Sequence, residues 1–421
     1  MRIKIENIAK VDNADIKLDG ITVIAGVNGT GKSTVSRSLY AILDSFYHRN
    51  AEIRENRRYS LFRAFANRMF TIDIVGHQMV VMPLIDDLIS QRDSLLKNKN
   101  AIRNIILNYI KDNDEISFFL EEGFNDEALE VTVDRVSEVL SVNDNKIVEK
   151  IVETSLRNEF YKQINNIKNQ DVGKIEVIIR GRHYKVKIKD DKVIDLSNNV
   201  ELNVKPIYFD NLSVFDLTRR MSFSSNGLPK HFTNLRDVVE DCKYENINHI
   251  EKIFASSKID TVEEKLNEAF RGSITTDKSG DFKWDTTGEG YFVDVHNLSM
   301  GMKTFALMKI LLENSVIGPE GVLILDEPEV HLHPQWQILF AEIIVLLQIE
   351  FNLHVLINTH SPYMLDALDV YLRKYDAKKN AHFYRSANSG EQSVLEDVTG
   401  NIELIFKDLV IPIRELERIE Y

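Results

Sequence analysis

The sequence predicts an α/β fold, with a mixed β-sheet, flanking helices and a mainly helical insertion. Three observations support this prediction. Residues 1–46 read as strands, a glycine loop and a helix. Over residues 322–386, strands that are apolar on both faces alternate with helices, as in a parallel sheet covered on two sides. Residues 84–168 have no proline and only Gly123 as glycine, and their patterns are helical.

The elements follow in order along the chain. Strands lie within residues 1–25, where MRIKIENIA alternates and ITVIA precedes the glycines. The next apolar residues recur at helical spacing in KSTVSRSLYAILDSF. Alternating patterns that flank turn residues predict hairpins at 70–82 (near Gly76), 174–196 (around Gly181) and 282–298. The other predicted elements are a strand within 205–211, mostly helix to about 270, strands at 322–326, 354–359 and 382–386, and helices at about 334–351 and 362–374.

These patterns divide the chain into four segments. The first and last form two parts of one head. A helical insertion with a β-hairpin and a helical linker separate them. The predicted bounds are 1–83, 84–204, 205–281 and 282–421.

The composition excludes several classes of protein. The net charge of −13 excludes binding of polyanions by bulk attraction, although a local basic groove remains open. Cys242 is the single cysteine, so an internal disulfide and a multi-cysteine zinc site are excluded. The sequence shows no signal peptide and no apolar run long enough to span a bilayer. We expect a cytoplasmic protein without a membrane partner.

The stretch GVNGTGKST, residues 26–34, is the strongest motif. It fits G-x-x-x-x-G-K-[ST] and lies between an apolar strand and a helix, as a phosphate-binding P-loop requires. Backbone N–H groups would surround phosphate oxygens, Lys32 would contact the β- and γ-phosphates of ATP, and Ser33 would hold Mg²⁺. The predicted loop residues are Asn28, Gly29, Thr30, Gly31, Lys32, Ser33 and Thr34. The alternative is a chance glycine turn.

Two further motifs follow apolar strands. VLILDEP places Asp326 and Glu327 at a strand end, where Asp326 can reach Mg²⁺ through its water shell and Glu327 can orient the attacking water. INTHSP places His360 after the next strand, in reach of the γ-phosphate. The alternatives are a capping carboxylate pair and a structural histidine.

The stretch NLSMGMK, residues 297–303, opens a strongly periodic helix and forms a second anion-binding helix start. One chain thus has two predicted phosphate-binding helix starts but only one pair of carboxylates at a strand end. We interpret the second cradle as serving the ATP that another copy holds.

His331 and His333, within LDEPEVHLHPQW, raise the alternative of a metal site. They lie in a loop that leads into a helix starting near Pro334, and no third ligand stands at a zinc-like spacing. We therefore do not expect these two histidines to bind metal.

The motifs GxxGxGKST, LSMGMK, LILDEPExHLHP and NTHSP, in this order, resemble those of ABC-type ATPases, and DEPEVHLHPQWQ is similar to the OLD-like and RecF-like branch. The resemblance covers about 1–75 and 280–421. It implies that Asp326 is the Walker B aspartate, Glu327 the catalytic glutamate and His360 the switch histidine.

The same resemblance assigns Ser299 and Gly301 to the signature that acts on the ATP of the opposite subunit in a head-to-tail homodimer. Met300 stands where the family has a second signature glycine. Gln78, after a predicted strand, is the candidate for the glutamine that contacts Mg²⁺. His331 to Pro334 correspond to the D-loop region at the dimer seam.

Several relatives in this branch carry a C-terminal Toprim nuclease, for which the 61 residues after His360 are too few. The chain thus resembles stand-alone anti-phage defence ATPases of the PtuA and AriA type, which implies a separate nuclease partner. The alternative is a RecF-like ATPase of DNA repair or chromosome maintenance, and the basic stretches 48–68 and 180–189 are candidates for DNA contact. A third reading, a nucleotide-binding module without hydrolysis, is disfavoured by the intact Glu327.

Overall fold

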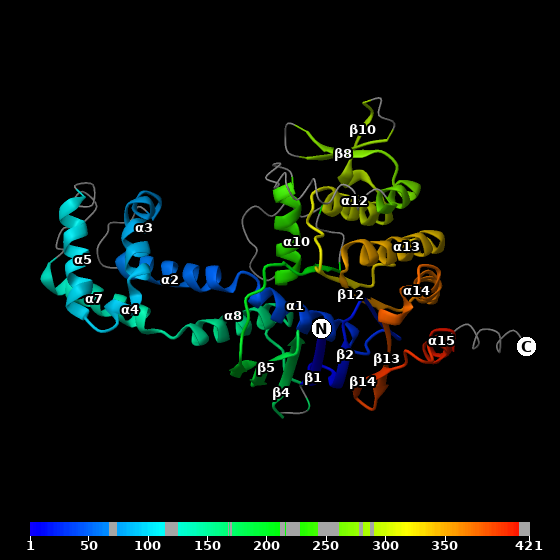
Figure 1. The fold of residues 1–421 in the computed structure, drawn as a ribbon, viewed down its shortest axis with the longest axis horizontal. Helices are drawn as coiled ribbons and strands as arrows, with labels where there is room; N and C mark the ends of the chain where they lie inside the picture. The colour runs from blue at the N-terminus through cyan, green and yellow to red at the C-terminus, as the bar shows by residue number, and fades with distance from the viewer. Residues whose placement is uncertain are drawn as a thin grey trace, which may run out of the picture. The chain divides into compact units, whose positions relative to one another are not determined.

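The computed structural model describes residues 1–66, 74–113, 125–166, 168, 171–210, 215, 228–242, 261–277, 281–286 and 290–411, with the backbone alone at 74–79. These residues form two compact units. The head unit combines Met1–Tyr47 with Val152–Tyr421, and the insertion unit is His48–Ile151. Figure 1 shows the elements of both units.

The head unit is built on one large mixed sheet. In the described part of the chain this sheet has 11 strands in the order β6-β5-β4-β1-β2-β14-β13-β3-β12-β11-β7. The strands are β1 (Arg2–Ile8), β2 (Val11–Lys17), β3 (Ile21–Ala25), β4 (Gly173–Ile179), β5 (Arg182–Lys189), β6 (Lys192–Ser197), β7 (Ile207–Phe209), β11 (Val322–Asp326), β12 (His354–Thr359), β13 (Ala381–Ser389) and β14 (Gln392–Asp397).

The parallel part of this sheet carries the predicted motifs. Strands β13, β3, β12, β11 and β7 pair in parallel, so their carboxyl ends meet at one edge. The antiparallel part runs from β2 through β1 and β4 to β5 and β6. The predicted mixed sheet is therefore confirmed. Strand β14, which the sequence analysis did not predict, joins the two parts because it pairs with β13 and with β2.

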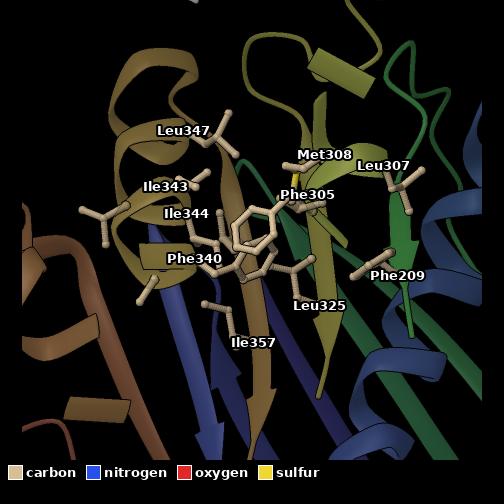
Figure 2. Close-up of a cluster of buried hydrophobic side chains, with 14 of the residues drawn as sticks. Phe209, Phe305, Leu307, Met308, Leu325, Phe340, Ile343, Ile344, Leu347 and Ile357 are labelled. Atoms are coloured by element: carbon tan, nitrogen blue, oxygen red, sulfur yellow. The ribbon is translucent and has the colours of Figure 1, made fainter. Parts of the chain in front are cut away.

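Helices cover both faces of the parallel strands, which explains why β3, β11 and most of β12 are buried on both sides. One face packs against α12 (Met300–Glu313), α13 (Pro334–Phe351) and α14 (Pro362–Lys374). Figure 2 shows this core, in which Phe305 and Phe340 lie over Leu325 and Ile357. The rings of Phe305 and Phe340 are 5.6 Å apart and nearly perpendicular. The other face packs against α1 (Lys32–Phe46), with the ring of Tyr40 5.7 Å from that of Tyr208.

Smaller elements complete the described head. A three-stranded sheet contains β8 (Ser273–Thr276), β9 (Phe282–Asp285) and β10 (Phe292–Asp294). The antiparallel pairing of β9 with β10 confirms the predicted hairpin at 282–298. The remaining elements are α10 (Lys230–Asp241), η2 (Val295–Asn297), η3 (Lys378–Asn380) and α15 (Glu403–Leu409). Much of the predicted helical stretch up to residue 270 lies outside the described residues.

The insertion unit is helical, as predicted. Its elements are α2 (Arg49–Ala66), α3 (Ile74–Ser90), α4 (Arg92–Leu95), α5 (Lys99–Asp112), α7 (Asp126–Ser141) and the start of α8 (Asp144–Glu159). They pack around a separate apolar cluster that includes Phe65, Ile85 and Val136. Arg57 is buried and donates hydrogen bonds to the carbonyls of Val139, Leu140 and Val142. This interior arginine holds the end of α7 against α2.

Two predictions about this region are wrong. The hairpin at 70–82 is replaced, from residue 74 on, by helix α3, whose Val81, Leu84, Ile85 and Leu88 recur at helical spacing and are buried. Residues 70–73 lie outside the described part. The apolar run that suggested a strand is the buried face of a helix, and a short apolar run does not distinguish the two by periodicity.

The predicted segment bounds of 1–83 and 84–204 also differ from the two units. The insertion already begins at His48, because α2 packs on α3 and α7. It ends at Ile151, because β4 pairs with β1 and thereby brings β5 and β6 into the sheet of the head. The open edge of β1 has backbone groups that need partners, and this pairing satisfies them. None of the described helices is long and apolar enough to cross a membrane.

Candidate active site

The glycine loop between β3 and α1 has the conformation of a phosphate cradle. Gly31 caps α1 with a φ of 82°, and an added Cβ would lie 2.7 Å from Cγ2 of Val11. Both the left-handed φ and the close approach therefore require glycine at this position. No side chain caps α1, so N–H groups of its first turn are available to an anion. Asn28 and Gly29 are exposed at the loop tip, which fits a phosphate-bearing ligand.

Buried polar contacts hold the rest of this loop. The hydroxyl of Thr30 donates to the carbonyl of Val27 at 2.8 Å, and the carbonyl of Thr30 accepts from the hydroxyl of Ser386 on β13 at 2.5 Å. Ser33 and Thr34 lie half-buried in the first turn of α1. These hydrogen bonds fix the shape of the loop, while the tip of the loop remains exposed.

Lys32 lies under the loop, 4% exposed. Its Nζ donates to the carbonyls of Gly26 and Val27, both at 3.0 Å, and lies 3.7 Å from Oε1 of Glu327. Burial lowers the pKa of Lys32, although three neighbouring carboxylates oppose this shift. The sequence places Lys32 and Glu327 far apart, and the parallel pairing of β3, β12 and β11 brings them to the same sheet edge.

Asp326 ends β11 and is 7% exposed. Its Oδ1 accepts from the side-chain amide of Asn358 at 2.8 Å, and its Oδ2 accepts from the hydroxyl of Tyr208 at 2.8 Å. The amide of Asn358 also donates to the hydroxyl of Ser36 on α1 at 2.8 Å. The sequence analysis missed Asn358 and Tyr208. Their signal is an asparagine and a tyrosine within otherwise apolar strands.

Glu327 and His360 face each other across the ends of β11 and β12. Glu327 has a φ of 52°, which turns the chain out of β11, and its N–H donates to the carbonyl of Asn358 at 2.9 Å. Nδ1 of His360 lies 3.4 Å from Oε1 of Glu327. This contact lowers the pKa of Glu327 and raises the pKa of His360, against the effect of burial in both cases. The carboxylate form of Glu327 is therefore favoured.

Glu329 contacts both the backbone and the ring of His360. The sequence analysis missed this residue as well. It is 3% exposed, and its Oε1 accepts from the hydroxyl of Thr359 at 2.6 Å and from the backbone N–H of His360 at 2.9 Å. The same oxygen lies 3.4 Å from Nδ1 of His360. Burial raises the pKa of Glu329. The third acidic residue of DEPE, two positions after Glu327, is the signal that could have found it.

Ser299 and Gly301 lie at the start of α12. Ser299 is exposed and caps the helix, accepting from the N–H of Met302 at 3.3 Å. A Cβ on Gly301 would lie 2.8 Å from the carbonyl of His331. The structure therefore packs the predicted signature against the segment that follows Glu327. His333 caps α13 with Nδ1, which accepts from the N–H of Gln335 at 3.4 Å, and the described residues contain no metal-binding cluster.

Gln78 is not where the sequence analysis placed it. It belongs to helix α3 of the insertion unit, and the described residues just before it, from Ile74 on, are helical as well. The reason for choosing it, a position after a strand of the head, is therefore wrong.

Ser361 links the histidine loop to α13 and supplies a test of the local architecture. Its hydroxyl caps α14 by accepting from the N–H of Met364 at 3.3 Å and donates to Oε1 of Gln337 at 2.6 Å. We expect Ser361→Ala to lower the free energy of unfolding by about 1 kcal/mol. Chemical denaturation measures this loss. Ser94→Ala, at an exposed serine of the insertion, is the control, and an equal loss in both variants would contradict the assignment.

Comparisons with known proteins identify a family and several similar proteins. Residues 21–366 match the family described as "AAA domain, putative AbiEii toxin, Type IV TA system". A curated relative, "Retron Vc95 probable ATPase" of Vibrio cholerae serotype O1 biovar El Tor, is 22% identical over 385 residues, which cover 82% of this chain and 66% of the relative, just under two thirds.

Two solved structures align with nearly the whole chain. An Smc head bound to the C-winged helix domain of ScpA is 10% identical, covers 96% of this chain and 98% of that chain, and has a TM-score of 0.41. The SMC head domain from Thermotoga maritima is 11% identical, covers 94% and 98%, and has a TM-score of 0.37.

The family match includes the glycine loop, the signature, Asp326, Glu327 and His360 within one continuous span. The chain therefore belongs to the AAA-domain family described as "AAA domain, putative AbiEii toxin, Type IV TA system", and it has a mixed α/β P-loop fold.

Proposed function

We propose that the chain binds ATP with Mg²⁺ at the edge formed by the glycine loop, Asp326 and His360, and hydrolyses it there. One observation carries this proposal. Lys32, Glu327 and His360 come from three distant segments, and Oε1 of Glu327 lies 3.7 Å from Nζ of Lys32 and 3.4 Å from Nδ1 of His360. Phosphoryl transfer to water can use this set of groups, which consists of a cation to contact the phosphates, a carboxylate and a histidine.

Each group has a defined task in this proposal. Lys32 leaves the loop carbonyls to contact the β- and γ-phosphates, and the first-turn N–H groups of α1 bind phosphate oxygens. Ser33 and Asp326 would hold Mg²⁺, which would supply positive charge to offset the negative charge of the phosphates. Glu327 accepts a hydrogen bond from the attacking water and orients it. His360 donates to the γ-phosphate.

The second cradle supports a head-to-tail homodimer. Ser299 is exposed at the start of a 14-residue helix, and Gly301 packs on the carbonyl of His331. An ATP bound to one copy would meet Ser299 and Gly301 of the other. The segment from Glu327 to His333 would then connect hydrolysis in one site to the signature that serves the other.

A mixing experiment tests this arrangement. Lys32→Ala removes the phosphate contact and Ser299→Arg blocks the signature, so each variant alone should hydrolyse ATP at background level. In a head-to-tail dimer, a mixed pair has one site with both defects and one intact site. Random pairing of equal amounts should restore about a quarter of wild-type activity per subunit, since half of the dimers are mixed and each has one intact site of two.

The control is a mixture of Lys32→Ala with the double variant Lys32→Ala/Ser299→Arg, in which every P-loop is defective and no activity should return. Absence of recovery in the first mixture, with dimers shown by mass measurement, would contradict the shared site. Hydrolysis by Lys32→Ala alone at the wild-type rate would contradict the nucleotide site itself.

At the level of biology, we propose a defence ATPase that acts as sensor and scaffold for a separate nuclease. The name of the retron relative supports this role, and the finer resemblance to PtuA or AriA stays a prediction. We expect a nuclease gene of HNH or Toprim type beside this gene, and co-purification of the two products in the presence of ATP. Purified nuclease that never associates with the ATPase, with or without ATP, would contradict the role.

The DNA-repair alternative receives less support from the described contacts. In the basic stretch 180–189, Arg180, Lys185 and Lys187 pair with Glu320, Glu176 and Asp195. In the stretch 48–68, Arg54 and Arg58 pair with Asp86, and Arg57 is buried. Cations that neighbouring acids neutralise contribute little to phosphate binding.

A further inference from the structure

A tyrosine that the mechanism above does not use lies directly behind Asp326. Tyr208 is the central residue of β7 and is 1% exposed. Tyr208 pairs in register with Ile324, which precedes Asp326 by two residues. The side chains of Tyr208 and Asp326 therefore leave the same face of the sheet. The hydroxyl of Tyr208 reaches Oδ2 of Asp326 at 2.8 Å, while Oδ1 accepts from Asn358. Both carboxylate oxygens thus have a fixed donor from the protein.

The ring of Tyr208 is itself held by a buried charged group. His231, 1% exposed, stacks on it with ring centroids 4.2 Å apart and planes 23° apart. Nδ1 of His231 lies 2.6 Å from Oε2 of Glu159, and Nε2 lies 2.9 Å from Oδ2 of Asp210. Glu159 is fully buried and also accepts from the backbone N–H of His231 at 2.9 Å. Two carboxylates therefore fix the plane of the imidazole against the phenol ring.

We propose that Tyr208 is a positioning residue for Asp326, and that His231, clamped between Glu159 and Asp210, holds Tyr208 in place. Asp326 alone could rotate about its side-chain bonds. With one donor on each oxygen, its carboxylate is held in a single orientation. Groups that orient a metal-binding carboxylate raise the affinity of the site without touching the ion. The inference rests on the proposed function, because it takes Asp326 as a residue that holds Mg²⁺.

Tyr208→Phe removes only the hydroxyl and leaves the ring stacked on His231. The probe is a fluorescent, non-hydrolysable ATP analogue, whose dissociation constant is measured in excess EDTA and in saturating Mg²⁺. We expect the metal-free affinity to stay at the wild-type value. The gain in affinity that Mg²⁺ produces should fall by about tenfold, and the Mg²⁺ concentration for half-maximal hydrolysis should rise by a similar factor.

Tyr40→Phe is the matched control. Tyr40 packs against Tyr208, but its hydroxyl accepts from Asn234 at 2.6 Å and lies near Asp44, away from Asp326. This variant should keep the wild-type response to Mg²⁺. Should Tyr208→Phe fail to fold by circular dichroism, Glu159→Gln provides the test, since it retains shape and weakens the hold on His231. We expect the gain in affinity from Mg²⁺ to fall in this variant too, by a smaller factor than in Tyr208→Phe.

An unchanged gain from Mg²⁺ in folded Tyr208→Phe, or in Glu159→Gln where that variant is used, overturns the inference. These measurements distinguish failure of the proposed function from failure of the role proposed for Tyr208. Wild-type protein that binds no ATP analogue with or without Mg²⁺ contradicts the proposed function. Wild-type protein with Mg²⁺-dependent binding and a Tyr208→Phe variant that matches it contradicts only the role of Tyr208.

Discussion

Glu327→Gln should lower the rate of ATP hydrolysis by about 10²- to 10⁴-fold, the usual contribution of a positioned general acid or base. Glutamine has the same shape but no charge, so it cannot accept the proton of the attacking water. The carboxylate is only 32% exposed and lies at the end of β11, between Lys32 and His360. Steady-state phosphate release measures the loss, and the dissociation constant for ATP should stay near the wild-type value.

This variant also separates binding from hydrolysis. If the proposed dimer closes on ATP, Glu327→Gln should accumulate as a dimer in ATP, and mass photometry would show it. Glu6→Gln is the control, because Glu6 is half-exposed on β1 and pairs with Lys174. Hydrolysis by Glu327→Gln at the wild-type rate would show that another group orients the water.

The second large effect concerns stability and pH, and it comes from His231. Burial alone would lower the pKa of His231, but the contacts with Asp210 and Glu159 outweigh burial and raise its pKa to about 9. The folded state then binds a proton that the unfolded state releases near pH 6.5. The stabilisation is fully present below pH 6.5 and is lost as the pH rises through about 9. The shift corresponds to about 3 kcal/mol of unfolding free energy across this window.

Urea unfolding between pH 6 and 10 measures this slope. His231→Gln removes the titrating group, so its unfolding free energy should vary less with pH over the same range, whatever its absolute stability. His382→Gln is the control, because burial lowers the pKa of that histidine and it contributes no loss on the alkaline side. A variant of His231 that keeps the wild-type slope would show that other groups cause the pH dependence.

Candidate functional residues were predictable where a short stretch of sequence specifies the local structure that positions them. The glycine loop is recognisable because the required φ values, the free N–H groups and the lysine occur within nine residues. The common location of Asp326, Glu327 and His360 was predictable because each lies at or just after the end of an apolar strand, and parallel strands share one carboxyl edge. Residues that support them from behind were missed, since Glu329, Asn358 and Tyr208 act through partners that are distant in sequence.

The failures have a common physical reason. The apolar pattern around Val81 fits a strand as well as a helix, and the packing of α3 on α2 decided for the helix. Gln78 was chosen because it follows the predicted strand. The mistaken strand therefore also led to the mistaken assignment of Gln78 to the head. The unpredicted strand β14 forms between two edges, β13 and β2, and no pattern within its six residues indicates both partners.

The sequence by itself determined the α/β class, the phosphate loop, the order of the motifs and the helical nature of the insertion, because local periodicity and turn chemistry specify them. Only the tertiary structure decided where the insertion begins, which strands join the sheet, and that Tyr208, Asn358 and Asp326 share one face. These depend on pairing and packing between segments far apart along the chain. Such contacts form where they satisfy backbone groups and bury apolar area, and local sequence does not encode the partner.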